Sequence, residues 1–194
     1  MASLVLSGDT SGSITVAAPA VAGSTTQTLV ANSGTLAPVV SGTAITLTNQ
    51  TAPEFTAIPS WVKRITVMFQ GVSSNGTGNY LIQLGTGSTT YTTSGYLGTS
   101  TVSSTAGNNA ANMSSGFLLN QSSQGAACVF HGSVTITNIN SNSWVAMGYC
   151  GQSDAARGWT TGGSVSLSAT LTAVRLFIDG TQQFDAGTVN ILYE

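Results

Sequence analysis

The chain has 194 residues and a formal net charge of −2, and only 5% of its residues are charged, against about 25% in an average soluble domain. Its four cations, Lys63, Arg64, Arg157 and Arg175, are too few for the basic stripe that neutralises a run of phosphates. No apolar run approaches the roughly 18 residues needed to span a bilayer. We therefore expect neither nucleic-acid binding nor membrane insertion.

Hydroxyl side chains must build much of the surface. The chain contains 26 serines and 29 threonines, while 41% of its residues are hydrophobic and can form a core. A surface with so little charge gives copies of the protein little electrostatic repulsion. We expect a protein that packs against copies of itself or against a larger assembly.

The start of the chain indicates a reducing compartment, and the cysteine content indicates no metal site. Residues 1–10 lack the positive region and the long apolar stretch of a signal peptide, so we expect synthesis and assembly in a cytosol. That favours buried thiols at Cys128 and Cys150, although neighbouring strands could also bring them within disulfide distance. Two cysteines and one histidine supply too few soft ligands for a closed zinc site, and we expect no cofactor.

Residues 1–52 are predicted to be an anchoring segment. The first 50 residues contain one charge, Asp9, and no aromatic residue, so they have little bulk to offset the entropy lost on ordering. The short strands expected there are residues 13–16, 27–30 and 44–48. Such a segment is either loosely ordered or completed by neighbouring chains or by a docking surface. We expect it to serve anchoring and oligomerisation, and we expect residues 53–194 to form a displayed domain.

Apolar and polar residues alternate with a period of two along much of the remaining chain, which predicts strands. The pattern is clearest in residues 128–138, where Cys128, Phe130, Val134 and Ile136 alternate with polar residues. The other strands expected before residue 151 are residues 62–71, 80–84, 95–102, 116–119 and 144–150. No window keeps helical spacing, so we expect no helix.

The C-terminal part continues the same pattern. Residues 164–171 alternate, and the phase flips by residue 174, which predicts a bulge or a bend. Asp179-Gly180 lies between two strand patterns and predicts a hairpin. A turn at residues 185–187 and a last strand at 188–193 follow. The sequence therefore predicts an all-β fold, a jelly-roll-like antiparallel β-sandwich preceded by a short β-rich segment.

Several stretches resemble structural proteins of tailed bacteriophages and prophages. The residues that carry the resemblance are 58–69 (IPSWVKRITVMF), 81–85 (LIQLG), 94–98 (SGYLG) and 184–194 (FDAGTVNILYE), and the leader 12–23 (GSITVAAPAVAG) is similar to N-terminal segments of phage fibres and appendages. The resemblance covers most of the chain. It implies a virion protein, commonly trimeric, and transfers no site residues. Tail fibre, head fibre and capsid decoration remain alternatives.

The sequence offers little material for catalysis. Any serine–histidine arrangement must use His131, the single histidine, which alternation places on the polar side of its strand as a surface or cross-strand hydrogen-bonding residue. Ser153 lies in a stretch that begins like a nucleophile elbow but lacks its last glycine and its helix. Asp179 and Asp185 lie in turns, where aspartate is favoured for hydrogen bonding rather than as a glycosidase pair. We expect no enzymatic activity and no catalytic residue.

Binding remains an open alternative. Tyr80, Tyr91, Tyr96 and Trp159 lie in or beside loops rich in Gly, Ser, Thr and Asn. Aromatic rings among polar groups suit sugar recognition, and they equally suit packing against loops or a neighbouring subunit. Trp61 and Trp144 lie in strand patterns, and we expect them in the core.

These observations lead to a functional hypothesis. We expect a non-enzymatic, homotrimeric structural protein on the surface of a tailed-phage virion, assembled in the host bacterial cytoplasm. It would be a capsid-decorating protein or a short head fibre, held to other capsid or tail proteins by its N-terminal segment. The alternative is the receptor-binding tip of a tail fibre that recognises bacterial surface glycans.

Overall fold

The computed structural model describes residues 3–7, 10–17, 26, 37–87, 90–120 and 124–194, and its regular elements are all β-strands. The contacts divide the chain into two units, Met1–Leu36 and Ala37–Glu194. None of the described residues lies in a helix, which confirms the all-β prediction.

The first unit contains an antiparallel pair of strands. β1 (Ser3–Ser7) pairs with β2 (Ser13–Ala17), and Gly12, just before β2, has a φ of 79°, which only glycine adopts readily. The predicted strand at residues 13–16 is thereby confirmed, whereas the one expected at residues 27–30 lies outside the described residues.

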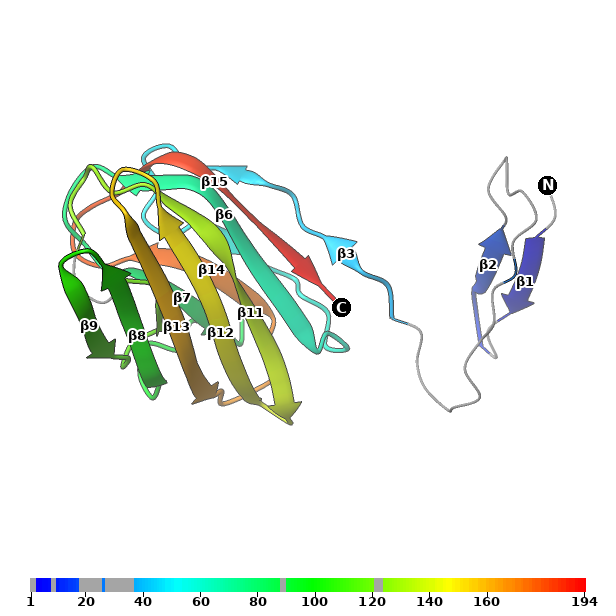
Figure 1. The fold of residues 1–194 in the computed structure, drawn as a ribbon. Helices are drawn as coiled ribbons and strands as arrows, with labels where there is room; N and C mark the ends of the chain where they lie inside the picture. Colours follow the sequence, from blue (N-terminus) through cyan, green and yellow to red (C-terminus); the bar gives the residue numbers. More distant parts are fainter. Residues whose placement is uncertain (1–2, 8–9, 18–25, 27–36, 88–89, 121–123) are drawn as a thin grey trace. The chain divides into compact units, whose positions relative to one another are not determined.

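The second unit contains a large antiparallel sheet in the order β3-β15-β6-β11-β12-β13-β8-β9, with β4 also paired to β15 (Figure 1). Its strands are β3 (Val40–Ser41), β4 (Ile45–Thr46), β6 (Arg64–Ser74), β8 (Leu97–Ser104), β9 (Gly107–Asn112), β11 (Phe130–Asn140), β12 (Ser143–Gln152), β13 (Arg157–Ser166) and β15 (Phe184–Tyr193). The consecutive strands β11, β12 and β13 form a meander at its centre.

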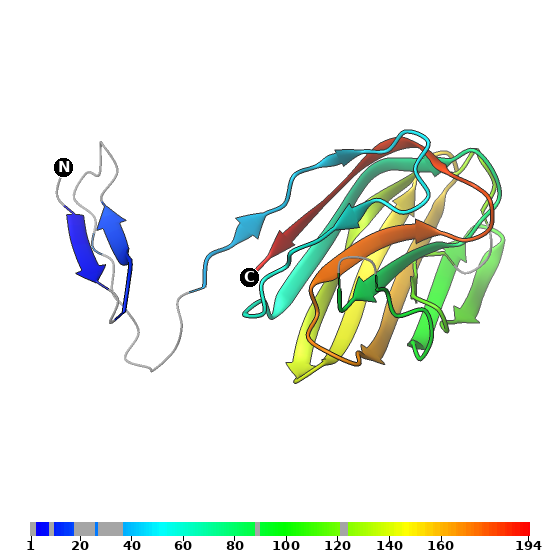
Figure 2. The ribbon, with the colours of Figure 1, turned by 180° about the vertical axis from the view of Figure 1, so that it is seen from behind.

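A smaller antiparallel sheet covers one face of the large one. Its order is β10-β7-β14-β5, and Figure 2 shows it in front of the large sheet. Its strands are β5 (Glu54–Phe55), β7 (Tyr80–Gly85), β10 (Phe117–Leu118) and β14 (Ala173–Ile178). The two sheets share one hydrophobic core, as in a β-sandwich. The jelly-roll connectivity remains a prediction.

Aromatic rings join the two sheets at the centre of this core. Tyr80, on the small sheet, packs edge-on against Phe130 and Phe184 of the large sheet, with ring centroids 5.1 Å and 5.3 Å away. Phe130 also contacts Trp159 at 5.9 Å. All four residues are at most 2% exposed. Burial of this much aromatic surface is a large stabilising contribution.

The hairpin predicted at Asp179-Gly180 is wrong. A turn does occur there, and Gly180 has a φ of 81°. However, β14 before it belongs to the small sheet and β15 after it belongs to the large sheet. β14 already pairs with β7 on one side and β5 on the other, so it has no open edge for a hairpin partner. The turn therefore carries the chain from one sheet to the other.

Two further features of the C-terminal region differ from expectation. The phase flip after residue 171 marks the passage from β13, which ends at Ser166, to β14 in the other sheet, rather than a bulge within one strand. Residues 185–187 are not a turn that precedes a strand. They lie within β15, where its pairing with β6 shifts register at Ala186. The phase flip marks a change of sheet, and the expected turn marks a register shift within one strand.

The sandwich also includes residues that precede position 53. Leu47 is 1% exposed, and its N–H donates to the carbonyl of Gly187. Gln50 and Phe184 exchange two backbone hydrogen bonds of 3.1 Å and 2.7 Å. The anchoring role of residues 1–52 remains a prediction, but the last part of that segment pairs with β15.

Two truncations distinguish the contribution of residues 1–36 from that of residues 37–50. Deletion of residues 1–36 is expected to leave the thermal midpoint of the second unit unchanged. Deletion of residues 1–50 removes Leu47 from the core and exposes the edge of β15. We expect it to lower the free energy of unfolding by at least about 2–5 kcal/mol, the usual loss for one buried leucine. Thermal denaturation followed by circular dichroism measures both, and equal midpoints would contradict this assignment.

Candidate functional site

Three of the four aromatic residues expected near a ligand are in the core. Tyr80 and Tyr96 are each 1% exposed and Trp159 is 2% exposed. The Tyr80 hydroxyl bonds to Ser74 Oγ at 2.9 Å, and the Tyr96 hydroxyl accepts the Leu84 N–H at 2.9 Å. Burial raises the pKa of both tyrosines to about 12. A ligand in solvent has no access to these rings, so their role is packing.

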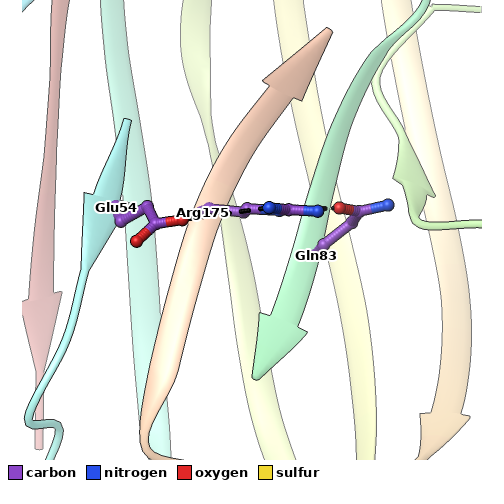
Figure 3. A network of polar contacts seen from close by, with 3 residues as sticks. All are labelled: Glu54, Gln83 and Arg175. Atoms are coloured by element: carbon purple, nitrogen blue, oxygen red, sulfur yellow. Dashed lines mark hydrogen bonds and ion pairs between the residues drawn. The ribbon is translucent and has the colours of Figure 1, made fainter. Parts of the chain in front are cut away.

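Tyr91, the fourth, lies against a polar network on the outer face of the small sheet. Arg175 lies between Glu54 and Gln83 on the flanking strands (Figure 3). Its Nε donates to Gln83 Oε1 at 2.8 Å, and its Nη1 is 3.8 Å from Glu54 Oε1. The guanidinium carbon is 4.1 Å from the centroid of the Tyr91 ring and 4.8 Å from that of Phe177. These contacts pair the Arg175 guanidinium with groups of the same chain, and they join three neighbouring strands of the small sheet.

The two tryptophans expected in the core behave differently. Trp144 is 4% exposed, as predicted. Trp61 is 41% exposed and packs against Tyr193 with ring centroids 6.0 Å apart, so its placement in the core was wrong. It precedes β6, which begins at Arg64, and strand alternation does not apply there.

His131 and Ser153 lie close together, but their arrangement does not suit nucleophilic catalysis. The Gly71 N–H donates to His131 Nδ1 at 3.2 Å, and His131 Nε2 is 3.2 Å from Ser153 Oγ. Because Nδ1 accepts a hydrogen bond, the proton of the neutral ring belongs on Nε2, which then donates to Ser153. A general base would need a bare nitrogen facing the serine. The predicted cross-strand hydrogen-bonding role of this histidine is confirmed.

The aspartates considered for acid–base chemistry are held by structural hydrogen bonds. Asp179 accepts the backbone N–H and the side-chain amide of Asn79, both at 2.7 Å, and Asp185 accepts the Ser73 hydroxyl at 2.6 Å. Desolvation acts to raise the pKa of Asp154, but hydrogen bonds led by the Val129 N–H hold that pKa below its ordinary value. Among the described residues, no three His, Cys, Asp or Glu side chains gather where they could hold a metal ion.

Cys128 and Cys150 are both buried and free. Burial raises the pKa of Cys150 to about 12 and also raises that of Cys128. The thiolate is the reactive form, so we expect neither cysteine of the native protein to react with an aromatic disulfide reagent at mildly alkaline pH. Both should react once denaturant unfolds the chain. Prompt labelling of the native protein, followed spectrophotometrically, would contradict this burial.

The outer face of the large sheet is the most distinctive exposed surface. On this face Met147 is 72% exposed, Tyr149 59% and Leu97 69%. Ser133 and Thr160 flank Tyr149 on the adjacent strands. The Tyr149 ring lies close over Gly158, where a Cβ would come within 2.5 Å of its hydroxyl oxygen. The hydroxyl end of this ring therefore lies over the sheet, while the residue as a whole remains open to solvent.

Charge is nearly absent from this part of the sheet. In β8, β9, β11, β12 and β13 the only residue with a full formal charge is Arg157, at the start of β13. Exposed apolar side chains with little charge around them make this face a candidate contact surface.

The N-terminal hairpin has a second exposed apolar surface. Leu4 lies opposite Val16, and Leu6 opposite Ile14, so these four side chains share one face. They are 54–69% exposed. A two-stranded hairpin alone is at best marginally stable in water, so this apolar face is a second candidate contact surface.

The described residues contain no helix that is long and apolar enough to cross a membrane. Comparison with protein-family models, with curated proteins and with solved structures found no match.

Proposed function

We propose that this chain is a non-enzymatic structural protein on the exterior of a tailed-phage virion, either a capsid-decorating protein or a short head fibre. The observation that carries the assembly part of the proposal is the charge-poor outer face of the large sheet, with Met147, Tyr149 and Leu97 exposed on it. A surface of this kind tends to associate in solution, because it lacks the charge that keeps copies of a protein apart. It suits a protein that is surrounded by other proteins in an assembly. The virion part is supported by the resemblance of residues 58–69 and 184–194 to phage structural proteins.

The N-terminal hairpin supports a homotrimer with an anchoring segment. Its apolar face, formed by Leu4, Leu6, Ile14 and Val16, has no charged residue in the described strands. Identical uncharged faces can pack together around a symmetry axis without electrostatic penalty. Other capsid or tail proteins would then contact the same N-terminal segment, and the sandwich would be displayed.

A non-enzymatic role is supported by the state of the polar side chains. His131 presents a donor rather than a base to Ser153, and Asp179 and Asp185 accept structural hydrogen bonds. We propose no cofactor for the protein. Its assembly would take place in the host bacterial cytoplasm.

Purified phage particles provide the test of this proposal. We expect the chain, expressed with an epitope after Glu194, to sediment with phage particles and to be bound there by an antibody without disruption of the particle. Deletion of residues 1–36 should leave the soluble protein folded and abolish its attachment. Absence of the chain from purified particles, or attachment that survives this deletion, would contradict the proposal or its anchoring part, respectively.

Glycan recognition is the second candidate function, and Tyr149 favours it. Its ring is held against Gly158 and flanked by the hydroxyl-bearing Ser133 and Thr160, and exposed aromatic faces beside hydroxyls suit sugar stacking. If the protein is a tail-fibre tip, purified host surface polysaccharide should bind it. Tyr149→Ala should then weaken binding at least about tenfold, a typical loss for one stacking ring. Equal affinity of the variant would exclude this site.

A further inference from the structure

The sheets of the second unit end in strands of very different length. Three of the four edges consist of two-residue strands: β3 and β4 at one end of the large sheet, and β10 and β5 at the two ends of the small sheet. Short edge strands are one way in which proteins prevent unwanted pairing. The fourth edge is β9, Gly107–Asn112, which has six residues and pairs with β8 alone among the described strands (Figure 1).

β9 lacks the other devices that protect an edge. It contains no charged residue and no proline, and its pairing with β8 runs without a register shift. Five of its six residues are exposed. Its backbone is therefore open to another strand.

The hydrogen-bond pattern shows which backbone groups of β9 point outward. The Met113 N–H donates to the Gly98 carbonyl at 3.0 Å, one position beyond the end of β9. In an antiparallel pair the residues alternate between bonding to the partner and pointing away from it. Gly107, Asn109 and Ala111 therefore bond to β8, whereas the N–H and C=O groups of Asn108, Ala110 and Asn112 point to the open edge.

These three outward residues form a palindrome centred on Ala110. If a second β9 approaches antiparallel, Ala110 pairs with its own copy, and Asn108 pairs with Asn112 at both ends. Alanine brings no charge to the twofold axis, and asparagine side chains opposite each other can exchange amide hydrogen bonds. No charge meets a like charge across the axis.

We propose that β9 is an interface at which a second copy of this chain pairs, β9 to β9, and extends the large sheet across a twofold axis. A twofold contact cannot by itself build a trimer, so it would join a copy in one proposed trimer to a copy in the next. The inference rests on the proposed function only in placing this contact between trimers. The open edge of β9 is a property of the sandwich itself.

Substitution of Ala110 tests the pairing. Ala110→Pro removes the outward N–H, and proline is tolerated where an edge N–H faces solvent. Ala110→Lys places two like charges opposite each other at the axis. Ala110→Val is the matched control, because it adds bulk and keeps the N–H. Circular dichroism should show all three variants folded, and sedimentation velocity of the full-length proteins over a concentration series gives their masses.

The expected result is a wild-type mass that rises with concentration to at least twice that of the basic oligomer. The valine variant should behave in the same way. The proline and lysine variants should stay at the mass of the basic oligomer, which is at most half the mass of the wild type at high concentration. High salt should partly restore the pairing of the lysine variant alone. Equal masses for the wild-type and proline proteins at every concentration would overturn the β9 contact and leave the trimer intact. A wild-type dimer with a monomeric proline variant would support the contact and contradict the trimer.

Discussion

Gly98→Ala is expected to destabilise the sandwich strongly. Gly98 lies in β8 opposite Gly163 of β13 and has a φ of 144°. A Cβ there would fall against the Gly162 carbonyl oxygen and the Gly163 Cα, which are backbone atoms that cannot rotate away. Because backbone strain and steric overlap add, we expect a loss of at least about 3 kcal/mol in the free energy of unfolding.

Gly162→Ala is the matched control. Gly162 lies in the adjacent strand, and no atom lies within 4 Å of the position its Cβ would take. Its unfolding midpoint in urea should stay close to that of the wild type. If Gly98→Ala were as stable as this control, the close approach of β8 and β13 would be wrong.

Trp159→Ala is expected to lower the free energy of unfolding by about 3–5 kcal/mol. The residue is 2% exposed, packs against Phe130, and donates its indole N–H to Gln152 Oε1 at 3.3 Å. The substitution leaves a cavity and also leaves the buried Gln152 without this donor, and both effects destabilise.

Trp61→Ala serves as the comparison, since Trp61 is 41% exposed. It should lose much less stability, about 1 kcal/mol or less, as substitutions away from the core usually do. Equilibrium denaturation of both variants decides the matter. A Trp159→Ala protein with wild-type stability would show that this ring does not hold the core and would reopen its assignment to ligand contact.

Strands with strict alternation could be predicted from the sequence. Residues 62–71, 128–138 and 144–150 correspond to β6, β11 and β12, because large apolar side chains on every second residue leave few other structures. Residues 157–163 of β13 and the whole of β9 could not be found in this way. Gly158, Gly162 and the asparagines of β9 carry no alternation in hydrophobicity, and their pairing depends on neighbouring strands.

The candidate site was harder to predict than the fold. The sequence suggested Tyr80, Tyr96 and Trp159 because polar loops adjoin them, but long-range packing buries all three. Tyr149 was overlooked, although its strand carried the signal: Trp144, Ala146 and Cys150 face the core, so residue 149 must face outward. Which strands lie beside Tyr149 depends on sheet order, which alternation does not encode.

The mass of the purified full-length chain in solution tests whether this charge-poor β protein associates with itself. At low micromolar concentration we expect about three times the 19.6 kDa mass of one chain. Exposed ion pairs contribute about 0–1 kcal/mol each, and only two ion pairs occur among the described residues, so the oligomer should depend on apolar burial. The mass should therefore be unchanged at about 1 M salt, where the screening length is about 3 Å. A stable monomer, or an oligomer that dissociates in salt, would contradict the account.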